Sequence, residues 1–161
     1  RNYLEITSLE DLNDSKNFPE GYEVQLVQPI DFQLNKFFYK DIGKKHHWID
    51  RLVWTDRQWI EYISDKKVKT YVLKKNGNFA GYFELIIHID KNEVEIAYLG
   101  IFEEYRNQKL GSYLLSSAIK KAFLDTPKRV WVHTCSLDHK NALNNYLARG
   151  MKIFLTEEVI I

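Results

Sequence analysis

The part of this sequence that most constrains the fold is residues 95–115, EIAYLGIFEEYRNQKLGSYLL. Glu95–Ile101 is apolar and aromatic enough for a buried strand. Phe102–Lys109 is a short polar connection, and from Leu110 onward apolar residues recur at the spacing of one helix face. A strand that passes directly into a helix leaves free backbone N–H groups at the helix start, where the positive end of the helix dipole also lies. The sequence therefore predicts an anion site after this strand.

The residues around this helix start suit a ligand that carries phosphate. Arg106, Lys109, Gly111 and Ser112 surround it, and two of them are cationic. Gly111 has no side chain, so a ligand can approach the backbone closely at that position. We therefore expect a phosphate-bearing ligand here.

Composition and charge exclude several classes of protein. A chain of 161 residues is expected to form one domain, residues 1–161, with a substantial core. The 23 basic and 22 acidic residues nearly cancel, which argues against a general binder of nucleic acid or anionic membrane. No apolar run approaches the ~18–20 residues of a membrane span. The single cysteine, Cys135, excludes an internal disulfide framework and fits a reducing compartment, so we expect a cytoplasmic location.

Periodicity and turn signals predict the order of helices and strands. Asp31 is placed to cap a helix, and Thr55 with Gln58 forms a capping-box pattern. Asn76–Gly77 is typical of a type I′ hairpin turn. The expected elements are a brief strand or arm in residues 1–21, a strand over 22–27, helices over 32–42 and from 55, strands over 70–74, 79–90 and 94–101, a helix over 110–124, a strand over 129–134, a helix over 140–149 closed by Gly150, and a strand over 152–159.

This order predicts an α/β (α+β) fold built on one mixed sheet. Three strands between residues 70 and 101 are separated by short turns, so they form an antiparallel meander. A strand–helix–strand unit follows and brings in parallel pairing. Helices are expected on both faces of the sheet.

Residues 105–115, YRNQKLGSYLL, resemble the acyl-CoA pyrophosphate loop of the GNAT superfamily of N-acetyltransferases. The family pattern is Arg/Gln-x-x-Gly-x-Gly/Ala at the start of a long helix, and it requires a strand before it, as predicted here. Arg106 and Gly111 match its first and last positions, and Lys109 stands in place of the middle glycine. The predicted order of elements is also the one that the GNAT fold uses.

A second segment resembles the family further along the chain. Residues 142–151, ALNNYLARGM, resemble its A-x-x-x-Y-x-x-x-G-[FM] segment, with Tyr146 and Gly150 in place. His139 stands where the family usually has asparagine. The resemblance covers roughly Val68 to the C-terminus. By this resemblance, residues 67–161 form an acyl-CoA-binding core, and residues 1–66 supply helices and an arm on the acceptor side.

The resemblance implies acetyl-CoA as the cofactor. In the family, the strand before the loop splays from its neighbour, and its free amides bind pantetheine and polarise the thioester carbonyl. Gly100 would favour a bulge or a close approach here, or would only relieve packing against the helix. The residues implied to bind the cofactor are Leu99, Gly100, Ile101, Arg106, Asn107, Gln108, Lys109, Leu110, Gly111, Ser112, His139 and Tyr146.

Two residues are candidates for proton transfer. The resemblance places Tyr146 at the family's frequent general acid, which protonates the departing thiolate, and a phenol of reference pKa ~10 can donate at neutral pH. The alternative is packing of Tyr146 with Leu143. Glu95 lies where the histone-acetyltransferase branch has a glutamate that acts as general base through water. Strict alternation places Glu93 and Glu95 on one face with Leu99, so the alternative is a solvent-facing acid.

Other reactive side chains are weaker candidates. His46, His47, His133 and His139 are further bases at neutral pH. His46 and His47 are adjacent and would point apart, and no pair has the spacing of a zinc site, so no metal is expected. Cys135 could carry an acyl group as a nucleophile, but a small buried residue is the commoner role of such a cysteine.

Residues 43–59, GKKHHWIDRLVWTDRQW, are expected to form the wall that binds the acceptor. In the resembling family this position overhangs the acyl-transfer site. The competing interpretation makes its tryptophans part of the core. The expected acceptor contacts are Trp48, Trp54 and, on a later strand, His133, with Asp50 and Asp56 as negative charges for an ammonium group.

These features predict a cytoplasmic N-acetyltransferase that moves an acetyl group from acetyl-CoA to a primary amine by direct attack in a ternary complex. The acceptor is expected to be a small molecule or a peptide N-terminus, with no nucleic-acid or membrane partner, and a homodimer is compatible with the sequence. One alternative is a non-catalytic acyl-CoA sensor, which would bind CoA without turnover. Another is an interaction domain that binds no nucleotide, for which Lys109 in place of glycine is the argument.

Overall fold

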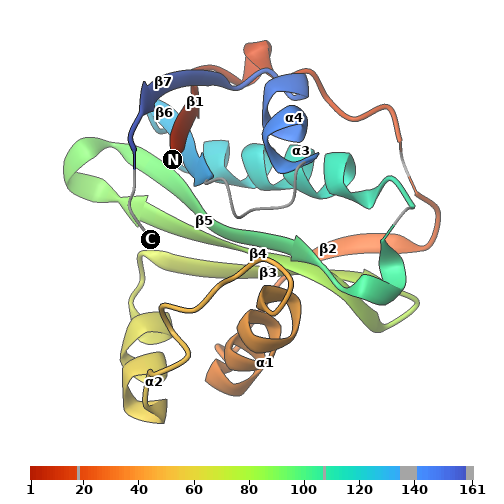
Figure 1. Cartoon of the computed structure of the whole chain (residues 1–161), viewed down its shortest axis with the longest axis vertical. Coiled ribbons are helices and arrows are strands. Elements are labelled where there is room, and N and C mark those ends of the chain that lie inside the picture. Colours follow the sequence, from red (N-terminus) through yellow and green to blue (C-terminus); the bar gives the residue numbers. More distant parts are fainter. Residues whose placement is uncertain (18, 107, 135–140, 159–161) are drawn as a thin grey trace.

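The computed structural model describes residues 1–17, 19–106, 108–134 and 141–158. In these ranges, seven strands form one mixed sheet in the order β2-β3-β4-β5-β6-β1-β7 (Figure 1). β5 and β6 are parallel, and the other neighbouring strands are antiparallel. The strands are β1 (Asn2–Ile6), β2 (Tyr22–Leu26), β3 (Val68–Lys75), β4 (Asn78–His88), β5 (Glu93–Ile101), β6 (Arg129–Thr134) and β7 (Lys152–Thr156).

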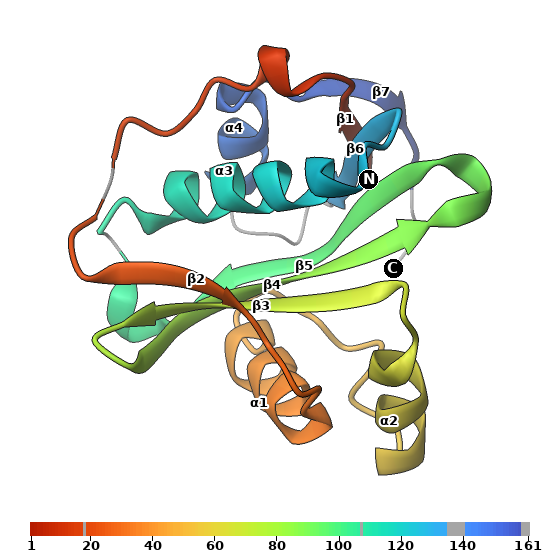
Figure 2. The same cartoon turned by 180° about the vertical axis from the view of Figure 1, so that it is seen from behind.

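Helices cover both faces of the sheet. α1 (Phe32–Gly43) and α2 (Asp56–Ser64) lie on one face, and α3 (Leu110–Ala122) and α4 (Asn141–Ala148) lie on the other, as Figures 1 and 2 show. A large apolar core fills the layer between the sheet and α3, and a smaller aromatic one lies under α1. None of the helices in the described ranges is both long and apolar enough to span a bilayer.

The predicted fold class is confirmed, together with the local signals behind it. The Asp31 carboxylate accepts a hydrogen bond from the N–H of Leu34 at the start of α1, and Thr55 and Gln58 form the capping box of α2. In the hairpin turn, Asn76–Gly77 has φ values of 49° and 85°, the double positive that a type I′ turn requires.

Some predicted ends are shifted or lie outside the described residues. The strand expected over residues 79–90 ends at His88, because Ile89–Lys91 form a 3-10 turn that closes on Asn92 at φ 54°. The last strand ends at Thr156, before the predicted residue 159, which is not among the described residues. Gly150 ends α4 as predicted, with φ 101°.

The N-terminal segment is built into the sheet. β1 lies between β6 and β7 and pairs antiparallel with both. Leu4 and Ile6 are fully buried in the core under α3, and this burial explains why so short a segment is held there. The amino group of Arg1 donates to the carbonyl of Glu157 at 2.7 Å, so residue 1 lies beside the segment that follows β7. Of the two expectations, a brief strand and an arm, the strand is observed.

A β-bulge interrupts β5 at Ala97. Ile96 pairs with Leu85 of β4 and Tyr98 pairs with Glu84, so Ala97 has no partner in β4. One extra residue in a strand reverses the direction of every side chain that follows it.

The bulge changes which faces the residues of β5 occupy. Ile96 and Leu99 both pack into the core under α3, although they are three residues apart, and Tyr98 packs into the cluster under α1. Glu95 points away from Ile96 and therefore lies on the face opposite to Leu99. The expectation of strict alternation from Glu93 to Leu99 is wrong, because the bulge at Ala97 interrupts it. The sequence gives no sign of this extra residue.

A buried ion pair joins the sheet to the segments on its α1 face. The guanidinium of Arg51 donates to both carboxylate oxygens of Glu84 at 3.1 and 3.0 Å, and the two side chains are 8% and 1% exposed. Asn35 of α1 and Tyr62 of α2 also donate to this carboxylate, at 3.4 and 2.8 Å. The same guanidinium lies 4.2–5.8 Å from the ring centres of Tyr39, Trp54, Trp59, Tyr62 and Tyr98.

This arrangement fixes α1, α2 and the connection between them on one carboxylate of β4. Burial and the charge of Glu84 raise the pKa of the Tyr62 phenol, so Tyr62 remains a hydrogen-bond donor at neutral pH. A buried charge without its partner is costly, so the whole group depends on the pair being complete.

We expect Glu84→Ala to lower the free energy of unfolding by about 3–5 kcal/mol, because it leaves the Arg51 guanidinium buried without a counter-charge. The control is Glu61→Ala, which breaks the exposed pair between Arg57 and Glu61 and should cost about 0.5 kcal/mol or less. Urea unfolding measures both, and the apolar double variant Arg51→Met/Glu84→Leu should recover only part of the loss, because Asn35 and Tyr62 still lose an acceptor. Equal costs for the two single variants would contradict the structural role of the buried pair.

Candidate functional site

A cavity of about 1350 Å³ lies where β5 and β6 separate. Glu93–Glu95 of β5 pair with Arg129–Trp131 of β6, and no pairing between the two strands follows in the described ranges. Beyond this point β6 continues beside β1 and β5 continues beside β4. The edge of β5 that faces the gap is therefore left with backbone groups available to a ligand.

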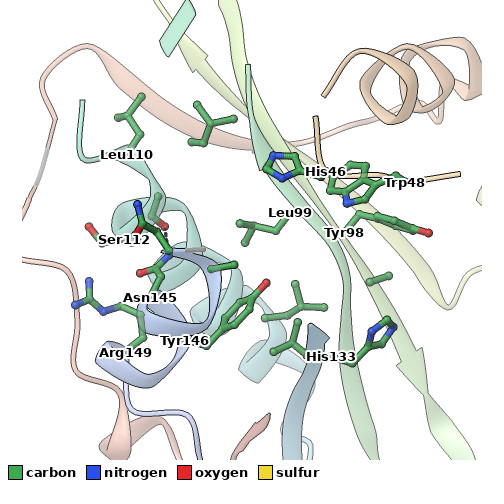
Figure 3. A pocket seen from close by; sticks show the side chains of 18 of the residues that line it. His46, Trp48, Tyr98, Leu99, Leu110, Ser112, His133, Asn145, Tyr146 and Arg149 are labelled. Carbon is green, nitrogen blue, oxygen red and sulfur yellow. Dashed lines mark hydrogen bonds between the residues drawn. The ribbon is translucent and has the colours of Figure 1, made fainter. Parts of the chain in front are cut away.

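Four further segments complete the walls of the cavity. They are the N-terminal segment 13–17, the connection 46–51 after α1, the start of α3 with residues 105–106 before it, and α4. Figure 3 shows Leu99 and Tyr146 on one side of β5, and Trp48 and Tyr98 on the other.

The start of α3 has the conformation that an anion site needs. Lys109 precedes the helix with φ 58° and ψ 26°, which is the left-handed region that glycine occupies most easily. Lys109, which stands where the resembling family has glycine, therefore adopts a conformation that a glycine could also take. Its side chain does not cap the helix, and the first N–H groups of α3 face the cavity beside Gly111.

Side chains from distant segments hold this turn in place. The amide of Asn17 donates to the carbonyl of Lys109 at 3.0 Å, and the hydroxyls of Ser15 and Ser112 lie 3.0 Å apart. On α4, the amide of Asn145 donates to the carbonyl of Gly111 at 3.0 Å. The sequence carried no sign of Asn145, Ser15 or Asn17, because each acts through a contact that only the tertiary structure creates.

Arg106 enters the cavity from the other side of the loop. Its guanidinium lies 3.2 Å from the Nε2 atom of His46, and the His46 ring stacks on Trp48 with centroids 5.6 Å apart. Gln108 is exposed, and its side-chain oxygen accepts a hydrogen bond from Tyr22 at 2.8 Å. The structure therefore brings Arg106 and Lys109 to the cavity, whereas Gln108 braces the loop from outside.

Tyr146 and Glu95 reach the cavity from opposite walls. Tyr146 is half-buried on α4 and points toward β5 (Figure 3). Glu95 lies at the last position where β5 still pairs with β6, and its side chain is 14% exposed. Its Oε1 atom lies 3.0 Å from the Nε2 atom of His88 on β4. Glu93, the neighbouring acid, is buried and accepts a hydrogen bond from Arg129 at 2.8 Å.

The proposed acceptor residues fall into two groups. Trp48 lines the cavity and also packs against Tyr98, with centroids 4.8 Å apart, so it has both a cavity role and a packing role. His133 is exposed and lines the cavity as well. Trp54 lies over Arg51 and does not line the cavity. The remaining acids are placed differently: Asp50 lines the cavity, and Asp56 forms an exposed ion pair with Lys36.

Three of the candidate residues, Asn107, Cys135 and His139, lie outside the described residues.

Among the residues that are described, no group of three or more histidine, cysteine or acidic side chains is arranged to hold a metal ion. Burial is the main cause that raises the pKa of the Tyr98 phenol, so the Tyr98 hydroxyl is neutral at neutral pH.

Two parallel strands that separate in a mixed sheet, with the start of α3 beside the gap, are the main features of this site. The chain is a member of the acetyltransferase (GNAT) family, because a model of that family matches residues 32–151, about three quarters of the sequence. The match begins well before Val68, where the sequence motifs placed its start, and so includes α1 and α2.

Solved structures with the same fold include several N-acetyltransferases. One is a GCN5-related N-acetyltransferase from Kribbella flavida, with 17% identity and a TM-score of 0.66 over 94% of this chain and 53% of that one. Another is the ribosomal-protein-S18-alanine N-acetyltransferase from Escherichia coli, with 14% identity and a TM-score of 0.63 over 80% and 76%. A third is the spermidine N-acetyltransferase from Vibrio cholerae in complex with CoA and spermine, with 15% identity and a TM-score of 0.67 over 82% and 81%.

At these identities the likeness shows the fold alone. The chain spans about half the length of the Kribbella flavida protein. No curated protein matches the sequence.

Gly100 yields a test of how tightly β5 is packed at the cavity. A methyl group added there would lie 2.4 Å from the Cγ2 atom of Ile42 on α1, so we expect Gly100→Ala to cost about 1–3 kcal/mol through overpacking. The matched control is Gly111→Ala, where the nearest atom is the Asn145 amide at 3.7 Å and no loss is expected.

A double-variant cycle by urea unfolding isolates this contact. Ile42→Ala removes the methyl group that would clash. The loss in free energy of unfolding of the double variant should therefore be smaller than the sum of the two single losses by at least ~1 kcal/mol. Simple additivity would show that Gly100 is not held against α1.

Proposed function

We propose that this chain is an N-acetyltransferase that transfers an acetyl group from acetyl-CoA to a primary amine by direct attack in a ternary complex. The observation that carries the proposal is the cavity at the β5–β6 fork, which joins the open start of α3 to a carboxylate and a phenol. The start of α3 is suited to phosphate, and Glu95 and Tyr146, on opposite walls, can move protons.

The residues present fit acetyl-CoA. The pyrophosphate would lie against the first N–H groups of α3, with Arg106 and Lys109 supplying positive charge. The unpaired edge of β5 over Leu99–Ile101 offers backbone groups for the pantetheine amides. Acetyl-CoA supplies an acyl carbon activated by a thioester. The left-handed turn at Lys109 supports a nucleotide site over an interaction domain that binds no nucleotide.

The protein's own residues would manage two protons. Glu95 is placed to take a proton from the acceptor ammonium, directly or through water, so that the amine lone pair becomes free. Tyr146, from the opposite wall, is placed to give its phenolic proton to the sulfur that leaves. The acceptor would approach between Trp48 and His133, where Asp50 adds negative charge.

The acceptor class is a primary amine, on a small molecule or at a peptide N-terminus. Proteins of the same fold are named for the ribosomal protein S18 alanine, spermidine and aminoglycosides, which are all amine acceptors. The single cysteine favours the cytoplasm as the compartment. The alternative function remains a non-catalytic acyl-CoA-binding module, which would show CoA binding and no thiol release with any amine.

CoA or acetyl-CoA should stabilise the folded chain. At a hundredfold excess over the dissociation constant the gain is about 2.7 kcal/mol. For a chain of this size, that should raise the melting temperature by roughly 5–10 °C. Differential scanning fluorimetry measures it, and the absence of a shift at millimolar CoA would reject the acyl-CoA proposal.

Gly111→Asp should abolish this thermal shift, because it sets a carboxylate against the pyrophosphate. The variant should still fold, since an acid in the first turn of a helix is favourable. Asn144→Asp is the matched control, because it adds the same charge on an exposed position of α4 outside the cavity wall, and its shift should be retained.

Tyr146→Phe should lower turnover by ~10²-fold or more while the thermal shift with CoA is retained, because only the transferable proton is lost. Glu95→Gln should lower turnover in the same way by removing the proton acceptor. Release of free thiol from acetyl-CoA with a panel of amines measures both. Full turnover in both variants would mean that the proton transfers occur elsewhere.

A further inference from the structure

Glu95 is the acidic residue that lies where β5 and β6 separate. It belongs to the last pair of residues that joins β5 to β6, opposite Trp131, and the bulge at Ala97 follows two residues later. Glu95 thus lies where the two strands begin to separate, and its backbone still pairs with β4 on one side and with β6 on the other. A base at this place has its backbone fixed by both neighbours, whereas the residues after it are fixed by β4 alone.

The side chain of Glu95 is also held in place, by a histidine of β4. His88 comes from β4, where it pairs with Glu93, and its ring reaches along the sheet to place Nε2 3.0 Å from Oε1 of Glu95. The same ring stacks on Trp131 of β6, with centroids 5.8 Å apart and an angle of 21° between the planes. The two rings therefore meet across β5, and the stack restrains the plane of the imidazole.

The chemistry of the contact fixes its direction. An ionised carboxylate only accepts hydrogen bonds, so the Nε2–H of His88 must donate. That bond occupies one oxygen of Glu95 and sets the rotation of the carboxylate, which leaves the second oxygen for the cavity. We propose that His88 is a positioning residue for acceptor activation, and this inference rests on the proposed function, in which Glu95 is the base.

The protons balance in this scheme. The acceptor ammonium gives one proton to the free oxygen of Glu95, its nitrogen then bonds to the acetyl carbon, and the carbon–sulfur bond breaks. The thiolate takes the proton of Tyr146, and the second proton lost by the nitrogen restores the tyrosine. His88 neither gains nor loses a proton, so its effect is on geometry. Displacements of about 1 Å can change a rate as much as 10²-fold.

The contact is also a poor candidate for a purely stabilising role. The His88 side chain is 35% exposed and that of Glu95 is 14% exposed, and a partly solvated hydrogen bond contributes only about 0.5–1.5 kcal/mol to stability. Substitutions at His88 should therefore leave the fold intact, so that an effect on rate can be observed separately.

Two variants of His88 separate the hydrogen bond from the ring. His88→Phe keeps an aromatic ring against Trp131 and loses the donor, and it should lower kcat ~10-fold while the KM for acetyl-CoA and the thermal shift with CoA stay unchanged. His88→Gln loses the ring but keeps an N–H donor, and it should stay within about threefold of the original kcat. Equal losses in both variants, or no loss in His88→Phe, would overturn the inference.

Two further measurements complete the test. In the Glu95→Gln background, His88→Phe should cause no additional loss, because His88 acts only through Glu95; multiplied losses would overturn the positioning role. Independently of turnover, nitrogen NMR of the histidine rings should show His88 protonated on Nε2, and an unprotonated Nε2 would also overturn it.

The outcomes for the two proposals are distinct. Absence of any thiol release from the unmodified protein would reject the proposed function, and the inference with it. Full turnover in Glu95→Gln, with a loss retained in Tyr146→Phe, would reject only the role of His88 and Glu95.

Discussion

Strand β5 is paired with β4 along its length but with β6 over only three residues, and the site follows from this difference. Where the two parallel strands separate, backbone hydrogen-bonding groups lose their partners, and such groups need either water or a ligand. The cavity forms in this gap, with the start of α3 at one side and Glu95 at the origin of the fork. A sheet paired throughout would have neither the space nor the free backbone.

The fork is stable because each of its arms is held by something else. β6 is kept in the sheet by β1, whose Leu4 and Ile6 are buried, and the N-terminal segment then continues along the cavity to brace the turn at Lys109 through Asn17. On the opposite face, the carboxylate of Glu84 ties α1, α2 and Arg51 to β4. The first third of the chain, which carries no motif, thus supports both walls of the site.

At Lys109 and Ala97 the backbone conformation differs from what the neighbouring residues predict. At Lys109 the sequence departs from the family's glycine, yet the chain keeps the left-handed turn, because Asn17 and the following helix hold it. At Ala97 nothing in the sequence marks the bulge, and alternation therefore assigned Glu95 and Leu99 to one face when they lie on two. Asn145 and His88 were missed for a related reason, since each matters only through a partner on another element.

The sequence by itself determined the order of the elements, their caps and turns, and the strand–loop–helix that carries Arg106 and Gly111, because all of these depend on residues close together in the chain. Only the tertiary structure decided that β1 lies between β6 and β7, that Trp54 packs on Arg51 while Trp48 reaches the cavity, and that His88 meets Glu95. These outcomes depend on strand register and on contacts between distant segments. Register is set by how the whole core packs, and no local window of sequence contains that information.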